Sequence, residues 1–330
     1  MIDRRRVVLC GLAVAACKAY GQPLPARVFR IGVLAVDAHL EEWVGWKAFV
    51  AELARRGYVD GRNLSLVRRY SSHDWNRLDA MAAELVALKV DLIFAAGGTR
   101  STIAAKNATA TIPIVFLGSA DPVRLGLVAT LAHPGGNVTG SAMLGGETSA
   151  KSLEILVEAI GAGNSIAYIQ PSYWRALPNF SLTRDALEAA ARVLGARLTL
   201  IYVDTPQALT LALERLVREG VGGVIIDQDE QWWPHRPHIS EMFIRWRLPA
   251  ISSDPEFAHA GLLLSYSLSD EDIGRKSATY VDRILRGAKP ADLPVEQVST
   301  WRLVINQRTA RAIGLTMPRA LLARADEVIE

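Results

Sequence analysis

Short runs of β-branched and other apolar residues alternate with longer amphipathic segments along most of the chain. In the first half the pattern predicts alternating strands and helices at 31–36, 41–56, 64–70, 75–88, 92–96, from Ser101 onward and at 114–117. The helix over 41–56 is expected to stop at Gly57, because a helix end favours a residue that adopts positive φ. Strands joined by helices of this length form parallel sheets with right-handed crossovers, so an α/β fold is predicted.

The same alternation restarts after residue 150. Helices are expected at 151–160, 182–194, 209–218 and 238–246, and strands at 166–169, 198–203, 224–226 and 250–251. A chain of 330 residues also exceeds what a single hydrophobic core usually serves. With 50% hydrophobic and 22% charged residues, the composition is that of an ordinary folded protein. We therefore expect two α/β lobes.

The N-terminus has the pattern of an export signal. Three consecutive arginines, Arg4 to Arg6, precede an uncharged and mostly apolar run over 7–16, which is too short to span a bilayer. Small residues before Gln22 favour simple cleavage after residue 21, whereas residues 14–17 resemble a lipobox with Cys17 as the acylated residue. With either cleavage the mature chain keeps at most one cysteine, so no internal disulfide and no thiolate metal site are expected.

The charge of the chain depends on this signal. Removal of residues 1–16 takes away three arginines and Asp3, which lowers the net charge from +3 to +1, and cleavage before Gln22 also removes Lys18 and leaves 0. The mature protein therefore carries no charge excess that would favour nucleic acid, and no nucleic-acid partner is expected.

Catalytic and cofactor motifs are missing from the sequence. It has no G-x-S-x-G elbow, no phosphate-binding loop, no G-x-G-x-x-G and no H-E-x-x-H. His235 and His238 lie three residues apart, but Pro234 and Pro237 place them at a helix start, and a solvated pair is the better interpretation. We expect a protein that is not an enzyme and that uses no metal and no cofactor.

Polar loops follow several of the expected strands. In open α/β sheets, ligands bind outside the carboxyl ends of the strands, and these loops lie there. The candidate ligand-binding residues in them are Gly98, Thr99, Ser101, Ser119, Asp121, Tyr173, Trp174, Asp227 and Asp254. The alternative for each hydroxyl or carboxylate is a helix cap, which uses the same residue types. Among the tryptophans, Trp43, Trp174, Trp232 and Trp233 are expected near the ligand, and Trp46, Trp75, Trp246 and Trp301 in packing roles.

Motifs along nearly the whole mature chain resemble the ABC-transporter substrate-binding protein family that includes tryptophan- and tyrosine-binding members. They are RIGVL, ELARRGYVDGRNLSL, RLDAMAAELVALKVDLIFAAG, AAKNATATIPIVF, DPVRLGLVATLAHPGGNVTG, SATYVDRILRGAKPADLPVEQ and LVINQRTARAIGLTMPRALLARADEVIE. The resemblance implies a type I periplasmic-binding-protein fold, with two Rossmann-like lobes, parallel sheets and three hinge crossings. The expected division is an export signal at 1–21 (1–16 for a lipoprotein), a first lobe at 27–140 plus 266–293, and a second lobe at 141–265 plus 294–330.

The resemblance also implies a function. It predicts an extracytoplasmic solute-binding protein that is located in the periplasm and is a monomer. This protein would close on a small carboxylate-bearing ligand, an amino acid or aromatic acid, and deliver it to an ABC permease in the inner membrane. By position, Thr99, Ser101, Ser119 and Asp121 would hold the ligand carboxylate and ammonium, and Asp227 or Asp254 would pair with the ammonium. The alternative is a sensory module that presents its ligand to a membrane receptor or histidine kinase.

Two departures from the family pattern bear on ligand specificity. Many relatives carry Asn-Pro after the first strand of the second lobe, where this chain has Gln170 and Pro171 followed by Ser172, Tyr173 and Trp174. A second bulky segment, residues 231–233, occupies another loop expected near the ligand.

Overall fold

The computed structural model describes residues 27–36, 38–72, 74–143, 145–176, 180–227, 229 and 232–330. The arginine cluster, Cys17 and both candidate cleavage sites lie outside these residues. In the part of the chain described, no helix is both long and apolar enough to cross a membrane.

The first lobe is built on a six-stranded sheet in which every neighbouring pair is parallel. Its strand order is β11 (Glu296–Gln297), β5 (Val138–Met143), β4 (Ile114–Ala120), β3 (Leu92–Ala95), β1 (Phe29–Ala35) and β2 (Leu64–Tyr70). Its helices are α1 (Val44–Arg55), α2 (Leu78–Ala87), α3 (Gly98–Ala108) and α9 (Asp270–Leu285), with 3₁₀ turns η1 (Ala38–Glu41), η2 (Trp75–Arg77) and η5 (Pro290–Asp292).

The second lobe is built on a seven-stranded sheet that is parallel except between β10 and β12. Its strand order is β13 (Glu327–Ile329), β12 (Trp301–Asn306), β10 (Leu264–Leu268), β9 (Ala250–Ser252), β8 (Gly223–Ile226), β6 (Ser165–Gln170) and β7 (Arg197–Tyr202). Its helices are α4 (Gly145–Ile160), α5 (Phe180–Leu194), α6 (Pro206–Arg218), α7 (Arg236–Arg245), α8 (Pro255–His259), α10 (Gln307–Ile313) and α11 (Arg319–Leu322), with turns η3 (Ser172–Ala176) and η4 (Trp233–His235).

The predicted α/β architecture of both halves is confirmed. The strand expected at 64–70 is β2, and α1 ends one residue short of the expected 56, before Gly57 with φ of 94°. The prediction missed the strands β5, β10, β11, β12 and β13. In β10 the pattern is obscured because buried serines alternate with the aromatic Tyr266, so the strand lacks the run of apolar residues that marks the central strands.

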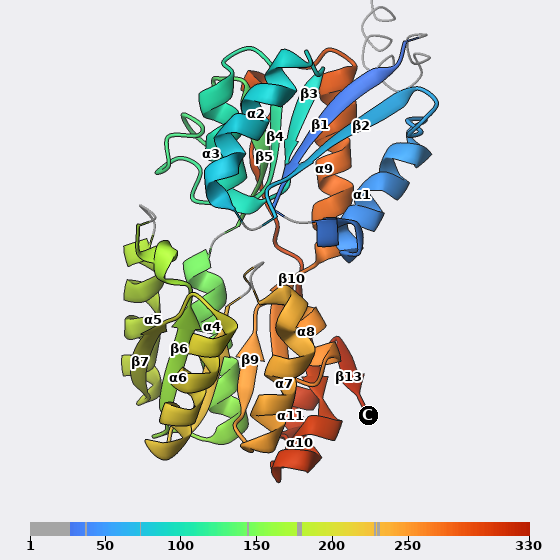
Figure 1. Ribbon diagram of the computed structural model, residues 1–330. Coiled ribbons are helices and arrows are strands. Elements are labelled where there is room, and N and C mark those ends of the chain that lie inside the picture. Colours follow the sequence, from blue (N-terminus) through green and yellow to red (C-terminus); the bar gives the residue numbers. More distant parts are fainter. Residues whose placement is uncertain are drawn as a thin grey trace, which may run out of the picture.

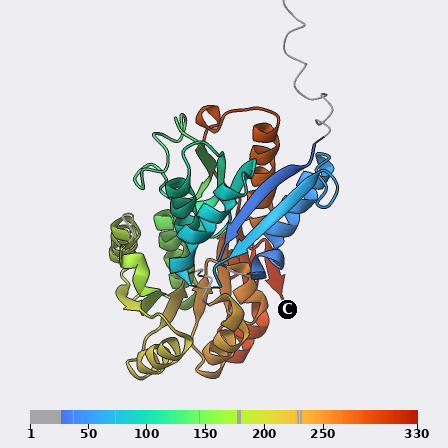
Figure 2. The same ribbon diagram turned by 45° about the horizontal axis from the view of Figure 1, so that its top comes forward.

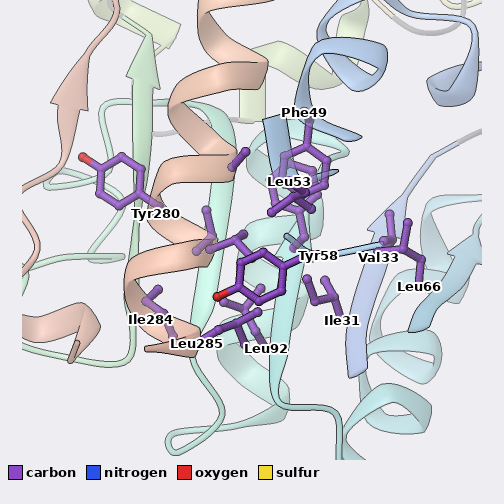
Figure 3. Packing of buried hydrophobic residues seen from close by; sticks show 14 of the residues in the cluster. Ile31, Val33, Phe49, Leu53, Tyr58, Leu66, Leu92, Tyr280, Ile284 and Leu285 are labelled. Carbon is purple, nitrogen blue, oxygen red and sulfur yellow. The ribbon is translucent and has the colours of Figure 1, made fainter. Parts of the chain in front are cut away.

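Helix α9 comes late in the chain but packs in the first lobe, beside α1 (Figure 1, Figure 2). The two helices approach closely at a pair of glycines, where a Cβ on Gly274 would lie 2.0 Å from the carbonyl oxygen of Gly45. Figure 3 shows Leu285 of α9 beside Tyr58 and Leu92, while Tyr280 lies on the side of α9 that faces away from α1. This packing places the first residues of α9 at the junction of the two lobes.

The chain passes between the two sheets three times, after β5, after β10 and after β11. Figure 1 shows the lobes one above the other, joined by these crossings. Each lobe has its own hydrophobic clusters, so each is held together by its own buried side chains. Such an arrangement allows one lobe to rotate against the other without breaking either core.

Candidate functional site

A cavity of about 340 Å³ lies between the two lobes. The first lobe lines it with the segments that follow β1 and β3, with β4, with η1 and η2, and with the start of α9. The second lobe lines it with the first residues of α4, with η3 and with the segments after β8 and β9. The volume is within the range of small-ligand sites, about 300 to 1000 Å³.

Five of the nine predicted ligand-binding residues line this cavity. They are Gly98, Thr99, Tyr173, Trp174 and Asp227. Because they come from both lobes, they are brought together only by the tertiary structure.

The other predicted residues lie elsewhere. The Ser101 hydroxyl accepts a hydrogen bond from Gly97 N at 2.9 Å, and so shapes the turn before α3 from outside the cavity. Asp121 accepts from Arg124 N at 3.1 Å, and Asp254 caps α8 by accepting from Glu256 N at 2.9 Å. Ser119 lies near the end of β4, and its side chain is outside the described part of the structure.

The amino end of α3 opens on the cavity. Its cap Gly97 and first residues Gly98, Thr99 and Arg100 all line the cavity. Gly98 has φ of 62°, a conformation that a residue with a side chain adopts at a cost. The first N–H groups of a helix have no partner within the helix and carry its positive end, so this turn suits an anionic group such as a carboxylate.

Asp227 provides a negative charge on the opposite lobe. It is buried, and its carboxylate accepts hydrogen bonds from the hydroxyls of Tyr168 and Ser253. Burial raises the pKa of Asp227 to about 6, against the opposing effect of these hydroxyls. No basic side chain of the described residues pairs with it, so the ionised form would gain from a cationic group on a ligand.

Asp229 orients two of the aromatic side chains. Its Oδ2 accepts from the Tyr173 hydroxyl at 2.5 Å and from Trp174 Nε1 at 3.3 Å, and all three residues line the cavity. Asp229 was not among the predicted ligand-binding residues.

Aromatic and basic side chains meet across the mouth of the cavity. The Arg100 guanidinium lies 4.6 Å from the ring centroid of Trp75 in the first lobe and 4.0 Å from that of Tyr173 in the second. The two rings are themselves 5.6 Å apart. A second contact pairs His39 of η1 with Trp233, with centroids 5.2 Å apart. The contacts of Tyr173 with Arg100 and Trp75, and the contact of His39 with Trp233, therefore join the two lobes.

Trp43, Trp174 and Trp233, which were expected near the ligand, line the cavity. The four tryptophans expected in packing roles do pack against hydrophobic clusters, and Trp75 also lines the cavity; they are Trp46, Trp75, Trp246 and Trp301. The expectation for Trp232 is wrong. Trp232 precedes η4 and is fully buried in the core of the second lobe, whereas its neighbour Trp233 lines the cavity.

Sequence reasoning also missed Asp270, which begins α9 and lines the cavity. Burial raises the pKa of Asp270 to about 7, and the nearby Asp254 acts in the same direction. The rule that ligand-binding residues follow strand ends would have selected Asp270, because it comes just after β10. It did not, because β10 had not been predicted. Among the described residues, no group of three or more His, Cys, Asp or Glu side chains is placed to hold a metal ion.

Two α/β lobes, three crossings and a cavity between the lobes define a type I periplasmic binding protein. The sequence profile of the ABC transporter substrate binding protein family matches residues 31–329, and this chain therefore belongs to that family. Proteins of this family work outside the cytoplasm.

The relatives include proteins with named ligands. The tyrosine-binding protein of Clostridioides difficile (strain R20291) is 27% identical over 269 residues, which cover 82% of this chain and 76% of the relative. An ABC domain from Streptococcus pneumoniae in complex with L-Trp is 26% identical, with a TM-score of 0.81 over 92% of this chain and 100% of that one. The ligand-free, open structure of a substrate-binding protein with adhesive properties from Clostridium difficile is 25% identical, with a TM-score of 0.66 over 92% and 99%.

Proposed function

We propose that this protein is the extracytoplasmic substrate-binding component of an ABC importer, and that it captures a small amino acid or aromatic acid between its lobes. The observation that carries the proposal is the opposite chemistry of the two cavity faces. The amino end of α3, with Arg100, faces the cavity from one lobe. Asp227, which has no basic partner among the described residues, faces it from the other. An α-amino acid has the complementary pair of charges.

The aromatic residues support a ligand with an apolar or aromatic body. Trp43, Trp75, Tyr173, Trp174 and Trp233 all line the cavity. Aromatic rings stack on one another and on cations, so such walls suit a flat side chain. The relatives that bind tyrosine and L-Trp point in the same direction.

Closure of the lobes is the proposed mechanism. At nearly equal identity, the structure is more similar to the L-Trp complex, with a TM-score of 0.81, than to the ligand-free, open relative, with 0.66. The contacts of Arg100 and His39 across the mouth agree with a closed arrangement. We propose that a ligand stabilises this arrangement and that the closed monomer presents its surface to a permease in the inner membrane.

Export would precede this role. We propose that the mature protein works in the periplasm, either free after cleavage following residue 21 or anchored through Cys17. Mass spectrometry of the protein from its native membrane and periplasmic fractions distinguishes the two.

Calorimetry on the mature, ligand-stripped protein tests the proposed ligand class. L-Tryptophan, L-tyrosine and L-phenylalanine are titrated together with the corresponding acids that lack the amino group. We expect binding of at least one amino acid, and weaker binding of its deaminated counterpart because Asp227 then has no cation to pair with. A folded sample that binds none of these compounds would contradict the proposal.

A further inference from the structure

The cavity has a second polar region where β10 ends and α9 begins. Ser267 of β10 lines the cavity and is only 3% exposed, yet its Oγ has no hydrogen-bond partner in the part of the chain described. Asp270 lines the cavity three residues later, and the indole of the cavity residue Trp43 lies against it. We call Ser267, Asp270 and Trp43 the hinge pole. A buried hydroxyl without a partner costs free energy, which a ligand group can recover.

Asp270 is held in surroundings that disfavour its charge. Burial is the largest cause that raises its pKa to about 7, and the acidic neighbours Asp254 and Glu256 raise it further. Arg302 and the Trp43 indole act in the opposite direction, but no basic side chain among the described residues forms an ion pair with Asp270. The apolar residues Leu268 and Ile273 line the cavity beside it.

The hinge pole is separate from the acidic region around Asp227. Asp227 follows β8 in the second lobe, where its carboxylate accepts hydrogen bonds from Tyr168 and Ser253. Asp270 begins α9, which packs in the first lobe, and the side chains with the largest effect on its pKa are Asp254, Trp43 and Glu256. The two carboxylates are therefore contributed by different lobes.

The charges that line the cavity are unbalanced. Asp227, Asp229 and Asp270 line it, whereas the basic residues described there are Arg100 and His39. An amino acid with a neutral side chain brings one carboxylate and one ammonium, which leaves this imbalance unchanged. A second cation on the ligand would reduce it.

We propose that the hinge pole binds a cationic nitrogen at the far end of the ligand, so that the substrate class is amino acids whose side chain ends in an ammonium or guanidinium group. The proposal rests on the proposed function, which accounts for the ligand's carboxylate and α-ammonium. The distal nitrogen donates to the Asp270 carboxylate and the Ser267 hydroxyl, beside the Trp43 indole N–H that also serves this carboxylate.

Three 4-substituted phenylalanines test the inference by calorimetry at pH 8, where Asp270 is ionised. They are 4-methyl-L-phenylalanine, L-tyrosine and 4-(aminomethyl)-L-phenylalanine, which share an α-amino acid and a ring but differ in the group at the far end. We expect the aminomethyl compound to bind the wild-type protein at least tenfold more tightly than the methyl compound. Asp270→Asn should reduce this preference to within about twofold, and Ser267→Ala should reduce it partly.

One variant serves as a matched control and should retain the full preference. Ser265→Ala removes another buried β10 hydroxyl without a described partner, but Ser265 does not line the cavity.

The outcomes separate the inference from the function on which it rests. Equal binding of the three compounds by the wild type overturns the inference and leaves the proposed function in place. A preference that survives in Asp270→Asn also overturns it. Binding of none of the three contradicts the proposed function, and the inference fails with it.

Discussion

Asp227 combines burial, a negative charge and a position on the cavity wall. A buried carboxylate is costly unless a hydrogen bond or an opposite charge compensates it, and among the described residues the hydroxyls of Tyr168, Ser253 and Ser149 do so. Asp254 is also buried, and burial also raises its pKa to about 6. Its carboxylate, however, caps the start of α8 by accepting a hydrogen bond from Glu256 N. The two residues show how the same residue type after a strand can serve a ligand or a helix.

Asp227→Asn should weaken binding of the amino acid identified by calorimetry by tenfold or more. Removing one charge of a desolvated ion pair costs about 2 to 5 kcal/mol. Asp254→Asn is the control, and its affinity should stay within about twofold of the wild type. An unchanged affinity in Asp227→Asn would remove this residue from the ligand site.

Affinity should fall as the pH is lowered through about 6. In the free protein the pKa of Asp227 is raised to about 6, and an ammonium beside it would lower this pKa in the complex. The ion pair between Asp227 and the ligand therefore stabilises the complex fully above pH 6. Below pH 6 this stabilisation is progressively lost, because Asp227 of the ligand-free protein is protonated and must lose its proton before it can pair. Calorimetry between pH 5 and 8 measures this. Affinity that stays constant over the range would be incompatible with an ionised Asp227 in the complex.

At the scale of elements, helix α9 links the first lobe's core to the ligand site. Its middle packs on α1 through Gly274 and Gly45, and its last turns bury Ile284 and Leu285 in the same cluster. The Arg56 guanidinium and the Tyr58 hydroxyl bond the Asp282 carboxylate at 2.9 and 3.0 Å, which fixes α9 along its axis. The position of Asp270 therefore depends on packing along the whole helix.

Gly274→Ala should lower the melting temperature clearly. The added Cβ would lie 2.0 Å from the backbone oxygen of Gly45, so the two helices would have to separate, and overpacking of this kind costs about 1 to 3 kcal/mol. Gly136→Ala is the matched control, because a Cβ there meets nothing within 4 Å. Thermal unfolding followed by circular dichroism compares the two. Equal melting temperatures would show that the helices adjust without cost.

Turn η2 contributes Trp75 to the contact across the mouth of the cavity. Trp75→Leu should raise the ligand dissociation rate a few-fold and leave the association rate nearly unchanged, because the lost ring contact with Tyr173 exists only when the lobes meet. Stopped-flow tryptophan fluorescence measures both rates. Trp301→Leu, which removes a ring stacked on Tyr266 away from the cavity, should leave them unchanged. A slower association with normal dissociation would contradict this role.

At the scale of the whole molecule, the three crossings join two separately packed lobes. Each lobe has hydrophobic clusters of its own, and one small cluster around Leu268, Ile273 and Val298 joins the lobes at the crossings. The cavity exists only between the lobes. A ligand that touches both lobes therefore binds the closed arrangement more tightly and shifts the population toward it.

Small-angle scattering should detect this shift. The ligand-stripped mature protein is expected to have a larger radius of gyration than the saturated protein, because the lobes separate when no ligand bridges them. Trp75→Leu should be more open than the wild type without ligand and close when saturated. Identical scattering curves with and without ligand would exclude hinge closure as the response to binding.

Much of the fold could be predicted from the sequence, since hydrophobic periodicity is local. Strand β2 was predicted to the residue, and most helices within a few residues. The prediction failed where local pattern and burial disagree. β10 is buried by its neighbours β9 and β12 despite its serines, and the side chains that decide this are far away in the sequence.

The candidate site could be predicted only in part. Loop position after a strand identified Gly98, Thr99, Tyr173, Trp174 and Asp227 among the cavity residues. The same rule also selected Asp121 and Asp254, because a cap and a ligand contact use the same side chains in the same kind of loop. Only the direction in which the carboxylate points separates the two roles.

By itself, the sequence determined the α/β class, the two lobes, the family and the strand ends where a ligand site could lie. These follow from the spacing of apolar residues and from motifs that are continuous in the chain. Only the tertiary structure decided that Arg100 meets Tyr173 and that Trp75 rather than Trp232 lines the cavity. It also decided that Asp270, at the crossing from β10 to α9, lines the cavity. The physical reason is that these contacts join residues of separate segments, and their geometry is set by how the lobes and helices pack.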